Sequence, residues 1–260
     1  MTLNSTGTTQ SGDFRRLIIA YLAAFSLIPM ITRNIIPHDM IENLYWGKET
    51  LLGYAKHPPL FAWISYFFYK CFFSWPESLY LLTQLNLLLG FYFLFQTAKL
   101  IFKDEVKSYA SVLIFMASVC AAFGNEKFNA STILMSLLPA INYFFVRLLK
   151  FNKNSDGILL GIFSALAFLG KYFALLHIGC MGLFLISDRD RWKFLRTPPI
   201  YWAAIVFLAG VSWHLFWMAD NDFITLKYAL DKSVNSPKNY FSAWNFVMMQ
   251  CLFFGTSFWA

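Results

Sequence analysis

Long uninterrupted apolar runs dominate this sequence and leave few folds open to it. They cover residues 17–36, 60–73, 79–98, 110–123, 133–149, 158–186, 200–218 and 243–259. Several of them reach the length that a helix needs to cross the hydrocarbon core of a bilayer. Inside lipid the backbone must satisfy its own hydrogen bonds, and the runs lack the alternation of barrel strands. The sequence therefore predicts an all-α, polytopic transmembrane helical bundle.

Composition narrows the class further, because 58% of the 260 residues are hydrophobic and only 13% are charged. Soluble globular domains carry far more charge. The formal charge of +7 comes from basic residues at the ends of apolar runs and not from one patch. Membrane orientation explains this better than a nucleic-acid partner. We find no repeat or linker and expect one domain over residues 1–260. Four single cysteines inside apolar runs are expected to be packing residues.

Two runs have awkward lengths for a membrane helix. Residues 60–73 would form about 21 Å of helix against about 30 Å of hydrocarbon, so we expect this run to lie in the interface. Residues 158–186 would form about 43 Å, which is too long for one span. Gly170 and Lys171 interrupt this run near its middle, so we expect a hairpin. The prediction is then about eight membrane helices, the hairpin included.

The distribution of charge supports this topology. This topology places 12 of the 21 lysines and arginines, together with six acids, on the same side of the membrane as Arg15 and Arg16. The other nine lysines and arginines lie on the opposite side with eight acids. Cytoplasmic loops of membrane proteins are enriched in Lys and Arg. The N-terminus is therefore expected in the cytoplasm, and residues 37–59, 124–131 and 220–240 at the outer face with the Lys171 turn.

The first outer loop, residues 37–59, carries an unusual share of ionisable groups. At helical spacing Asp39, Glu42, Asn43, Glu49 and Thr50 share one face, and Ile41, Leu44, Tyr45 and Leu52 share another. This pattern is typical of an amphipathic juxtamembrane helix with its acids turned to water, and Gly53 is a plausible helix stop. Asp39 and Glu42 also have the spacing of a capping box, which needs no chemistry. Alternatively, these carboxylates suit a reaction on a phosphate-bearing lipid, where a cation stabilises the leaving phosphate and a carboxylate takes a proton. Both interpretations stay open.

A family resemblance adds to these residues. The stretch "HDMIENLYWGKETLLGYAKHPPLFAW" resembles the first outer loop of the polytopic glycosyltransferases with the GT-C fold, in the bacterial branch related to dolichyl-phosphate-mannose protein mannosyltransferases and the aminoarabinose transferase of lipid A. Later pieces, "FNASTILMSLLPAINYFFVRLL", "GKYFALL" and "HLFWMADNDFITLKYAL", are similar to that family in the same order.

The resemblance implies sugar transfer, with inversion, from a polyprenyl-phosphate-linked donor at the outer face of a bacterial inner (plasma) membrane. The acceptor would be a glycolipid such as lipid A or lipopolysaccharide, a glycan or a protein, and membrane lipid would surround the site. Asp39 would be the general base, supported by Glu42. Lys56, His57 and Lys171 would hold the donor phosphate, and Tyr54 and Tyr172 would contact substrate.

Other interpretations of these residues remain. Lys171 at a hairpin tip could simply extend its ammonium to water. Loop polarity is enough to explain Glu126, Asn129 and Asp222. We expect no cofactor and no metal site, although His38, Asp39, Glu42 and His57 include good divalent-metal ligands.

Members of this family are usually longer, so we expect the chain to be incomplete at its C-terminus, its 260 residues corresponding to the N-terminal half of the GT-C fold. A non-catalytic truncated remnant or membrane scaffold is the main alternative to an enzyme. A transporter is a further alternative, which predicts inverted repeats and ionisable residues at mid-membrane. Most charges here lie in loops or near the ends of runs, which disfavours a transporter.

Overall fold

The computed structural model describes residues 5–118, 121, 126–234, 244–245 and 248, and these contain helices and no strand. The α-helices are α1 (Ser5–Thr32), α2 (His38–Glu49), α3 (Leu60–Cys71), α4 (Ser78–Phe102), α5 (Glu105–Ala117), α7 (Leu134–Phe151), α8 (Asn154–Gly170), α9 (Ala174–Ile186), α10 (Pro198–Asp220) and α11 (Ile224–Val234), and η1 (Arg189–Arg196) is a 3-10 helix. Residues 12–32 of α1 and the whole of α4, α7 and α10 are long and apolar enough to cross a membrane, while α8 and α9 are shorter apolar helices. The all-α, polytopic prediction is confirmed.

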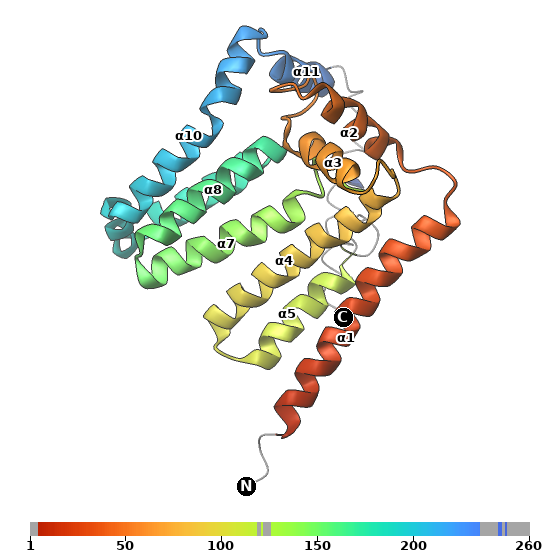
Figure 1. The fold of residues 1–260 in the computed structure, drawn as a ribbon. Coiled ribbons are helices and arrows are strands. Elements are labelled where there is room, and N and C mark those ends of the chain that lie inside the picture. The colour runs from red at the N-terminus through yellow and green to blue at the C-terminus, as the bar shows by residue number, and fades with distance from the viewer. Residues whose placement is uncertain (1–4, 119–120, 122–125, 235–243, 246–247, 249–260) are drawn as a thin grey trace.

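Close backbone contacts fix the direction of the helices (Figure 1). Gly157 of α8 lies against Pro199 of α10, and Gly210 of α10 lies against Ala165 of α8, so these helices run parallel. The chain must therefore return along α9 between them. The reversal occurs at Lys171, whose backbone is extended with φ −162° and ψ 131°. This arrangement confirms the predicted hairpin.

The same reasoning applies to the middle of the chain. Gly90 of α4 lies against Met135 of α7, and Lys150 near the end of α7 donates to the carbonyl of Leu100 at 3.0 Å. Helices α4 and α7 are therefore parallel, and α5 returns the chain between them. The connections thus gather at two ends of the bundle. We call the end that carries α2, α3 and the Lys171 turn the upper end, and the end near Lys103 the lower end, as in Figure 1.

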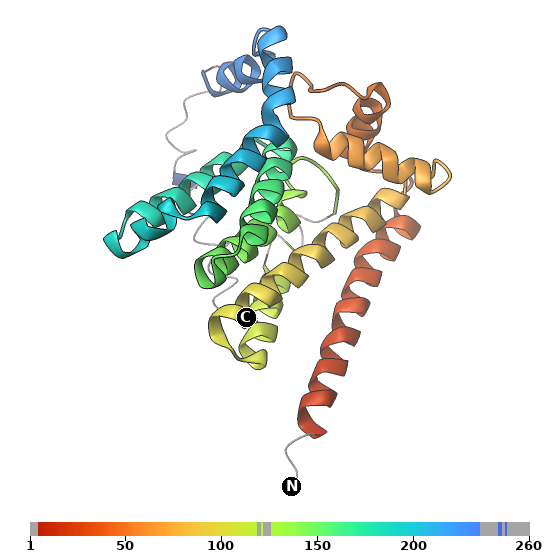
Figure 2. The same ribbon diagram turned by 60° about the vertical axis from the view of Figure 1, so that its left-hand side comes forward.

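Helix α3 lies across the upper end of the bundle, as Figure 2 shows. Its 12 residues extend about 18 Å, too little to cross a bilayer. It ends at Cys71, before Phe73 and Ser74 take positive φ values of 53° and 61°. Gly47 of α2 approaches the backbone of Ala62 closely, which packs α2 directly on α3. This geometry fits the expected interfacial position.

Several details differ from the sequence predictions. Helix α1 ends at Thr32, so residues 33–36 belong to the connection to α2. Cys71 and Cys180 are exposed, so the prediction that they are packing residues is wrong for these two. An exposed side chain on a membrane helix can contact lipid. Cys120, Cys251 and most of the apolar run 243–259 lie outside the described residues.

The contact between α8 and α10 supports a stability prediction. A Cβ added to Gly157 would lie 2.1 Å from the carbonyl oxygen of Pro199, so Gly157→Ala must push the helices apart. Overpacking of this kind costs roughly 1–3 kcal/mol. We expect the melting temperature of the purified protein in detergent to fall by several degrees. Gly179→Ala is the matched control, because nothing lies within 4 Å of its added Cβ and alanine is the better helix former. Equal melting temperatures for both variants would contradict the tight α8–α10 contact.

Candidate functional site

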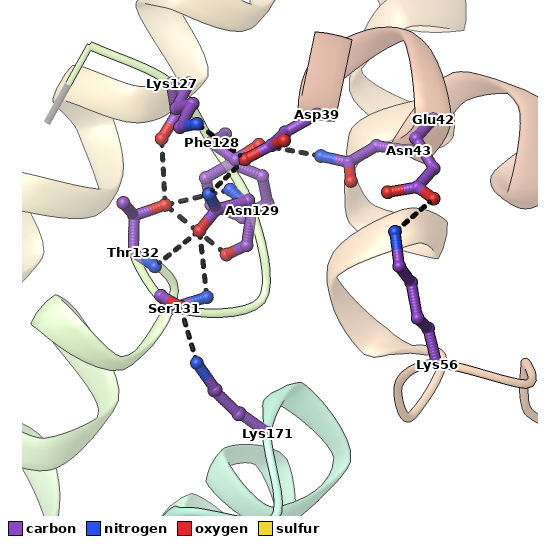
Figure 3. A network of polar contacts seen from close by, with 10 residues as sticks. All are labelled: Asp39, Glu42, Asn43, Lys56, Lys127, Phe128, Asn129, Ser131, Thr132 and Lys171. Carbon is purple, nitrogen blue, oxygen red and sulfur yellow. Dashed lines mark hydrogen bonds and ion pairs between the residues drawn. The ribbon is translucent and has the colours of Figure 1, made fainter. Parts of the chain in front are cut away.

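Polar side chains from four segments meet at the upper end of the bundle (Figure 3). They come from α2, from the first outer loop after it, from residues 126–132 and from the turn that begins at Lys171. We call residues 126–132 the bridging segment. The fold therefore brings the sequence-predicted charged residues to one surface.

Asp39 lies in the first turn of α2 and faces the bridging segment. Its Oδ2 accepts a hydrogen bond from Asn129 Nδ2 at 2.8 Å and lies 2.8 Å from Lys127 Nζ. The N-cap position belongs to Pro37, with no side-chain cap hydrogen bond. The capping-box interpretation of Asp39 and Glu42 is therefore wrong, because the helix begins two residues earlier than that motif requires.

The surroundings of Asp39 favour its ionised form. Partial burial opposes ionisation, but hydrogen bonds from Lys127 and Asn129 and the charge of Lys127 outweigh it and lower the pKa of this carboxyl. The side chains of Lys127 and Asp39 are still 42% and 35% exposed. Ion pairs this exposed contribute less than about 1 kcal/mol. The pair of Lys127 and Asp39 therefore adds little to the stability of the fold. Its main effect is to keep the Asp39 carboxylate ionised and oriented.

Asn129 organises the bridging segment. Its Oδ1 accepts from the backbone N–H groups of Ser131 and Thr132 at 2.8 and 2.9 Å, while its Nδ2 reaches Asp39. Thr132 closes the turn, accepting from Asn129 N at 2.8 Å and donating to the carbonyl of Lys127 at 3.0 Å. Loop polarity is therefore not a sufficient explanation of Asn129. An Asn in a short polar loop is the sequence signal of such a turn, because its side chain can bond the backbone two residues further on.

Asn43 holds the bridging segment to α2 from one turn beyond Asp39. It is 1% exposed, and its Nδ2 donates to the carbonyl of Phe128 at 2.7 Å and to Ser65 Oγ at 3.2 Å. The helical spacing groups Asn43 with the acids on a water-facing side, and this prediction is wrong. A carboxamide can be buried when its hydrogen bonds are made, and helical spacing alone could not distinguish this case.

Glu42 and Lys56 form a second pair beside Asp39. Lys56 Nζ lies 2.9 Å from Glu42 Oε1, and the ammonium also stands over the Trp46 ring at 5.9 Å from its centroid. The hydrogen bond to Glu42 raises the pKa of Lys56. Glu42 therefore neutralises the charge of Lys56 and does not contact Asp39.

Lys171 is the remaining cation of the cluster. Its Nζ donates to Ser131 Oγ at 2.6 Å, and burial lowers its pKa. Among the described residues no carboxylate lies within 4 Å of this ammonium. Lys171 is therefore held at the site by a neutral hydroxyl, which leaves its charge uncompensated.

His57 lies between these cations as a neutral ring. Its edge packs against Trp46 and Phe61, with centroid separations of 6.3 and 5.7 Å. Burial, followed by the positive charges of Lys171 and Lys56, lowers the pKa of His57 to about 4. At neutral pH the ring can donate or accept one hydrogen bond at each nitrogen according to its tautomer, but it adds no charge.

This pKa predicts an acid-sensitive fold. The unfolded chain takes up a proton on His57 near its ordinary value of 6.5, and the folded chain only near 4. Protonation in that window favours unfolding, so the free energy of unfolding falls as the pH falls from 6.5 towards 4. Between pH 7.5 and 5 we expect the melting temperature of His57→Gln to fall by less than that of the wild type. The exposed His38→Gln is the control, and an equal pH dependence in all three proteins would refute the buried neutral ring.

The two tyrosines named from the sequence take different positions. Tyr54 is 4% exposed and stacks on Trp46, with its hydroxyl donating to the Trp46 carbonyl at 2.5 Å. It lies beneath the site and fixes the turn that leads to His57. The Tyr172 hydroxyl lies 2.8 Å from His214 Nε2, and His214 Nδ1 lies 2.8 Å from the carbonyl oxygen of Leu52. Because that carbonyl can only accept, Nδ1 carries the proton and Nε2 accepts from Tyr172. The contact of either tyrosine with substrate stays a prediction.

His214 was not predicted as a site residue, although it opens a stretch that resembles the family. It is fully buried and ties α10 to the first outer loop. Gly53 is close by, and a Cβ there would lie 2.2 Å from the Trp217 ring. The end of α2 is Thr50 in the left-handed conformation, so Gly53 is required for this close approach and not as the helix stop. Only the fold reveals these contacts, because they join residues far apart in sequence.

Among the described residues, no three His, Cys, Asp or Glu side chains gather in a way that would hold a metal ion. Asp39 and Glu42, the two acids of the site, each face a lysine.

The sequence model of a family described as dolichyl-phosphate-mannose-protein mannosyltransferase matches residues 56–217. The matched range includes Lys56, His57 and the bridging segment, as well as Lys171, and begins after Asp39 and Glu42. No curated protein sequence and no solved structure matches the chain.

Proposed function

The chain belongs to the dolichyl-phosphate-mannose-protein mannosyltransferase family, and on that premise we propose that it transfers a sugar at the upper end of the bundle, with inversion. This family transfers glycosyl groups from polyprenyl-phosphate sugar donors. The acceptor in this proposal is a hydroxyl or comparable nucleophile of a glycolipid, a glycan or a protein. The upper end would face the outside of a bacterial inner membrane.

The ammonium of Lys171, unpaired among the described residues, is the observation that best supports the proposal. Three lysines and two carboxylates make up the described cluster, and Lys171 is the lysine that lacks an acid. A half-buried ammonium without a counterion suits the phosphate of a lipid-linked donor, because charge grows on that phosphate as the glycosidic bond breaks. In this proposal Lys171 and neutral His57 contact the phosphate, and Lys56, already paired with Glu42, contributes less.

Asp39 suits the opposite role in the same step. The acceptor oxygen would attack the anomeric carbon and form the new glycosidic bond while the bond from that carbon to the phosphate oxygen breaks. The electron pair would leave with the polyprenyl phosphate, and the acceptor proton would pass to Asp39. A carboxylate kept ionised by Lys127 and Asn129 is ready to accept a proton at neutral pH.

The orientation of the molecule can be tested directly. Most basic residues gather at the lower end, and the positive-inside rule supports a cytoplasmic location for that end. We expect a membrane-impermeant thiol reagent applied to right-side-out vesicles to label Lys48→Cys on α2 and not Lys103→Cys, with the native cysteines replaced. Both positions are exposed. Labelling of both from one side would overturn the proposed topology.

A transfer assay tests the activity itself. The full chain would be reconstituted in liposomes with a radiolabelled polyprenyl-phosphate sugar and a bacterial lipid and glycan extract. Donor-dependent appearance of label in the acceptor, lost in variants of Lys171 and Asp39, supports the proposal. Hydrolysis or transfer that is unchanged in those variants contradicts it, and the absence of any turnover with a folded wild type favours the non-catalytic alternative.

A further inference from the structure

A groove at the lower end of the bundle, between α1 and α5, lies far from the candidate site. It has a volume of about 400 Å³, and its walls include Phe14 and Leu17 of α1 and Tyr109 and Leu113 of α5. Phe14 lies near the start of the apolar part of α1, residues 12–32, and Arg33 directly follows the helix and pairs with Glu126 of the bridging segment. The 19 positions between them correspond to about 28 Å of helix. The groove therefore belongs to the opposite side of the membrane from Asp39 and Lys171.

Aromatic rings close the floor of this groove. The rings of Phe14 and Tyr109 have centroids 4.4 Å apart, and Phe95 of α4 lies 5.1 Å from Tyr109. Its sides stay open, because Leu17, Val106 and Leu113 are 48%, 62% and 40% exposed. The lining starts at Asp13, at the charged edge of the span, and continues into the apolar part of α1. A groove at this depth faces acyl chains and not soluble ligands.

Two lysines lie at the rim of the groove. Lys103 precedes α5, and Lys107 directly follows the lining residue Val106. Acids lie near this rim as well. Asp104 caps α5 by accepting from the backbone N–H groups of Val106 and Lys107, Asp13 of the lining is paired with Arg16 at 3.4 Å, and Glu105 is paired with Lys99 at 2.7 Å. Basic residues beside a membrane helix attract anionic headgroups.

We propose that this groove binds one acyl chain of an anionic phospholipid, whose phosphate lies beside Lys103 and Lys107. This inference is independent of the proposed function, since it concerns the other end of the bundle and no transfer chemistry. The apolar floor receives the chain, and the rim selects headgroup charge.

Native mass spectrometry of the full chain, released from detergent with equal amounts of phosphatidylglycerol and phosphatidylcholine, tests the site. We expect at least fivefold more phosphatidylglycerol adducts. Ala110→Trp fills the groove from an exposed position of α5 and should remove this excess. Ala20→Trp, at an exposed position of α1 outside the lining, should keep it. Lys103→Gln with Lys107→Gln should lower the preference below twofold while lipid binding continues.

Three results would overturn the proposal. They are equal retention of the two lipids by the wild type, an unchanged excess in Ala110→Trp, and a disulfide between Leu113→Cys and Cys251. The last result would show that the chain's own apolar run, and not a lipid, occupies the groove. Helical circular dichroism of each variant checks folding, and the double lysine variant keeps the test decisive when Ala110→Trp fails to fold.

Discussion

Replacing Lys171 by methionine is expected to lower the rate of sugar transfer by about 10²–10³-fold, the loss seen when one preorganised donor is removed from a developing negative charge. Methionine keeps most of the length of the side chain and its apolar contacts but loses the ammonium. Because Lys171 is held by Ser131 and not by an acid, its removal leaves no buried carboxylate unpaired. The expected effect is therefore on catalysis, measured as kcat in the reconstituted assay, with little change in melting temperature.

Lys171→Arg is the conservative control for this prediction. A guanidinium retains the charge but has a different shape and binds phosphate through two parallel hydrogen bonds. We expect partial activity, clearly above that of Lys171→Met. A methionine variant with wild-type kcat would show that Lys171 only extends to water, and the proposed phosphate contact would have to be abandoned.

Asp39→Asn is expected to have an effect of similar size, a loss of about 10²–10⁴-fold in kcat, the range for general-base catalysis. The amide keeps the shape of the carboxylate but cannot take the acceptor proton at neutral pH. Glu49→Gln is the matched control, since Glu49 is an exposed acid at the end of the same helix. It should retain wild-type activity.

A second comparison separates proton transfer from a structural role of Asp39. Asn129→Ala removes the hydrogen bond to Asp39 and the turn of the bridging segment, but leaves the carboxylate. A base role predicts that Asp39→Asn is much less active than Asn129→Ala at neutral pH, where the carboxylate of the latter variant is ionised. Similar residual activities in the two variants would mean that Asp39 acts only as an anchor of the bridging segment.

The membrane fold could be predicted from the sequence because it rests on local properties. Run lengths and the interruption at Gly170 and Lys171 were enough for the hairpin, and the short run 60–73 was enough for the transverse helix α3. These inferences need only the thickness of a bilayer and the rise of a helix. Helix ends were less predictable, as at Thr32 and Thr50, because they depend on contacts with other segments.

The site was only partly predictable. Charge and resemblance pointed to Asp39, Glu42, Lys56 and Lys171, and the structure places all four at the upper end. Their pairing could not be predicted, because Lys127 lies 88 positions after Asp39 and no local pattern connects the two residues. Asn43 and His214 were missed for a related reason: a buried polar residue is recognisable only when its hydrogen-bond partners are known.

The bridging segment has a consequence for the energetics of substrate binding. Within seven residues it contacts Asp39 through Lys127 and Asn129 and Lys171 through Ser131. A donor phosphate that draws Lys171 away from Ser131 therefore alters the support of Asp39, where the acceptor is expected. By thermodynamic linkage, each substrate then changes the affinity for the other by the same factor. Donor and acceptor should bind cooperatively, with the affinity for one depending on the concentration of the other.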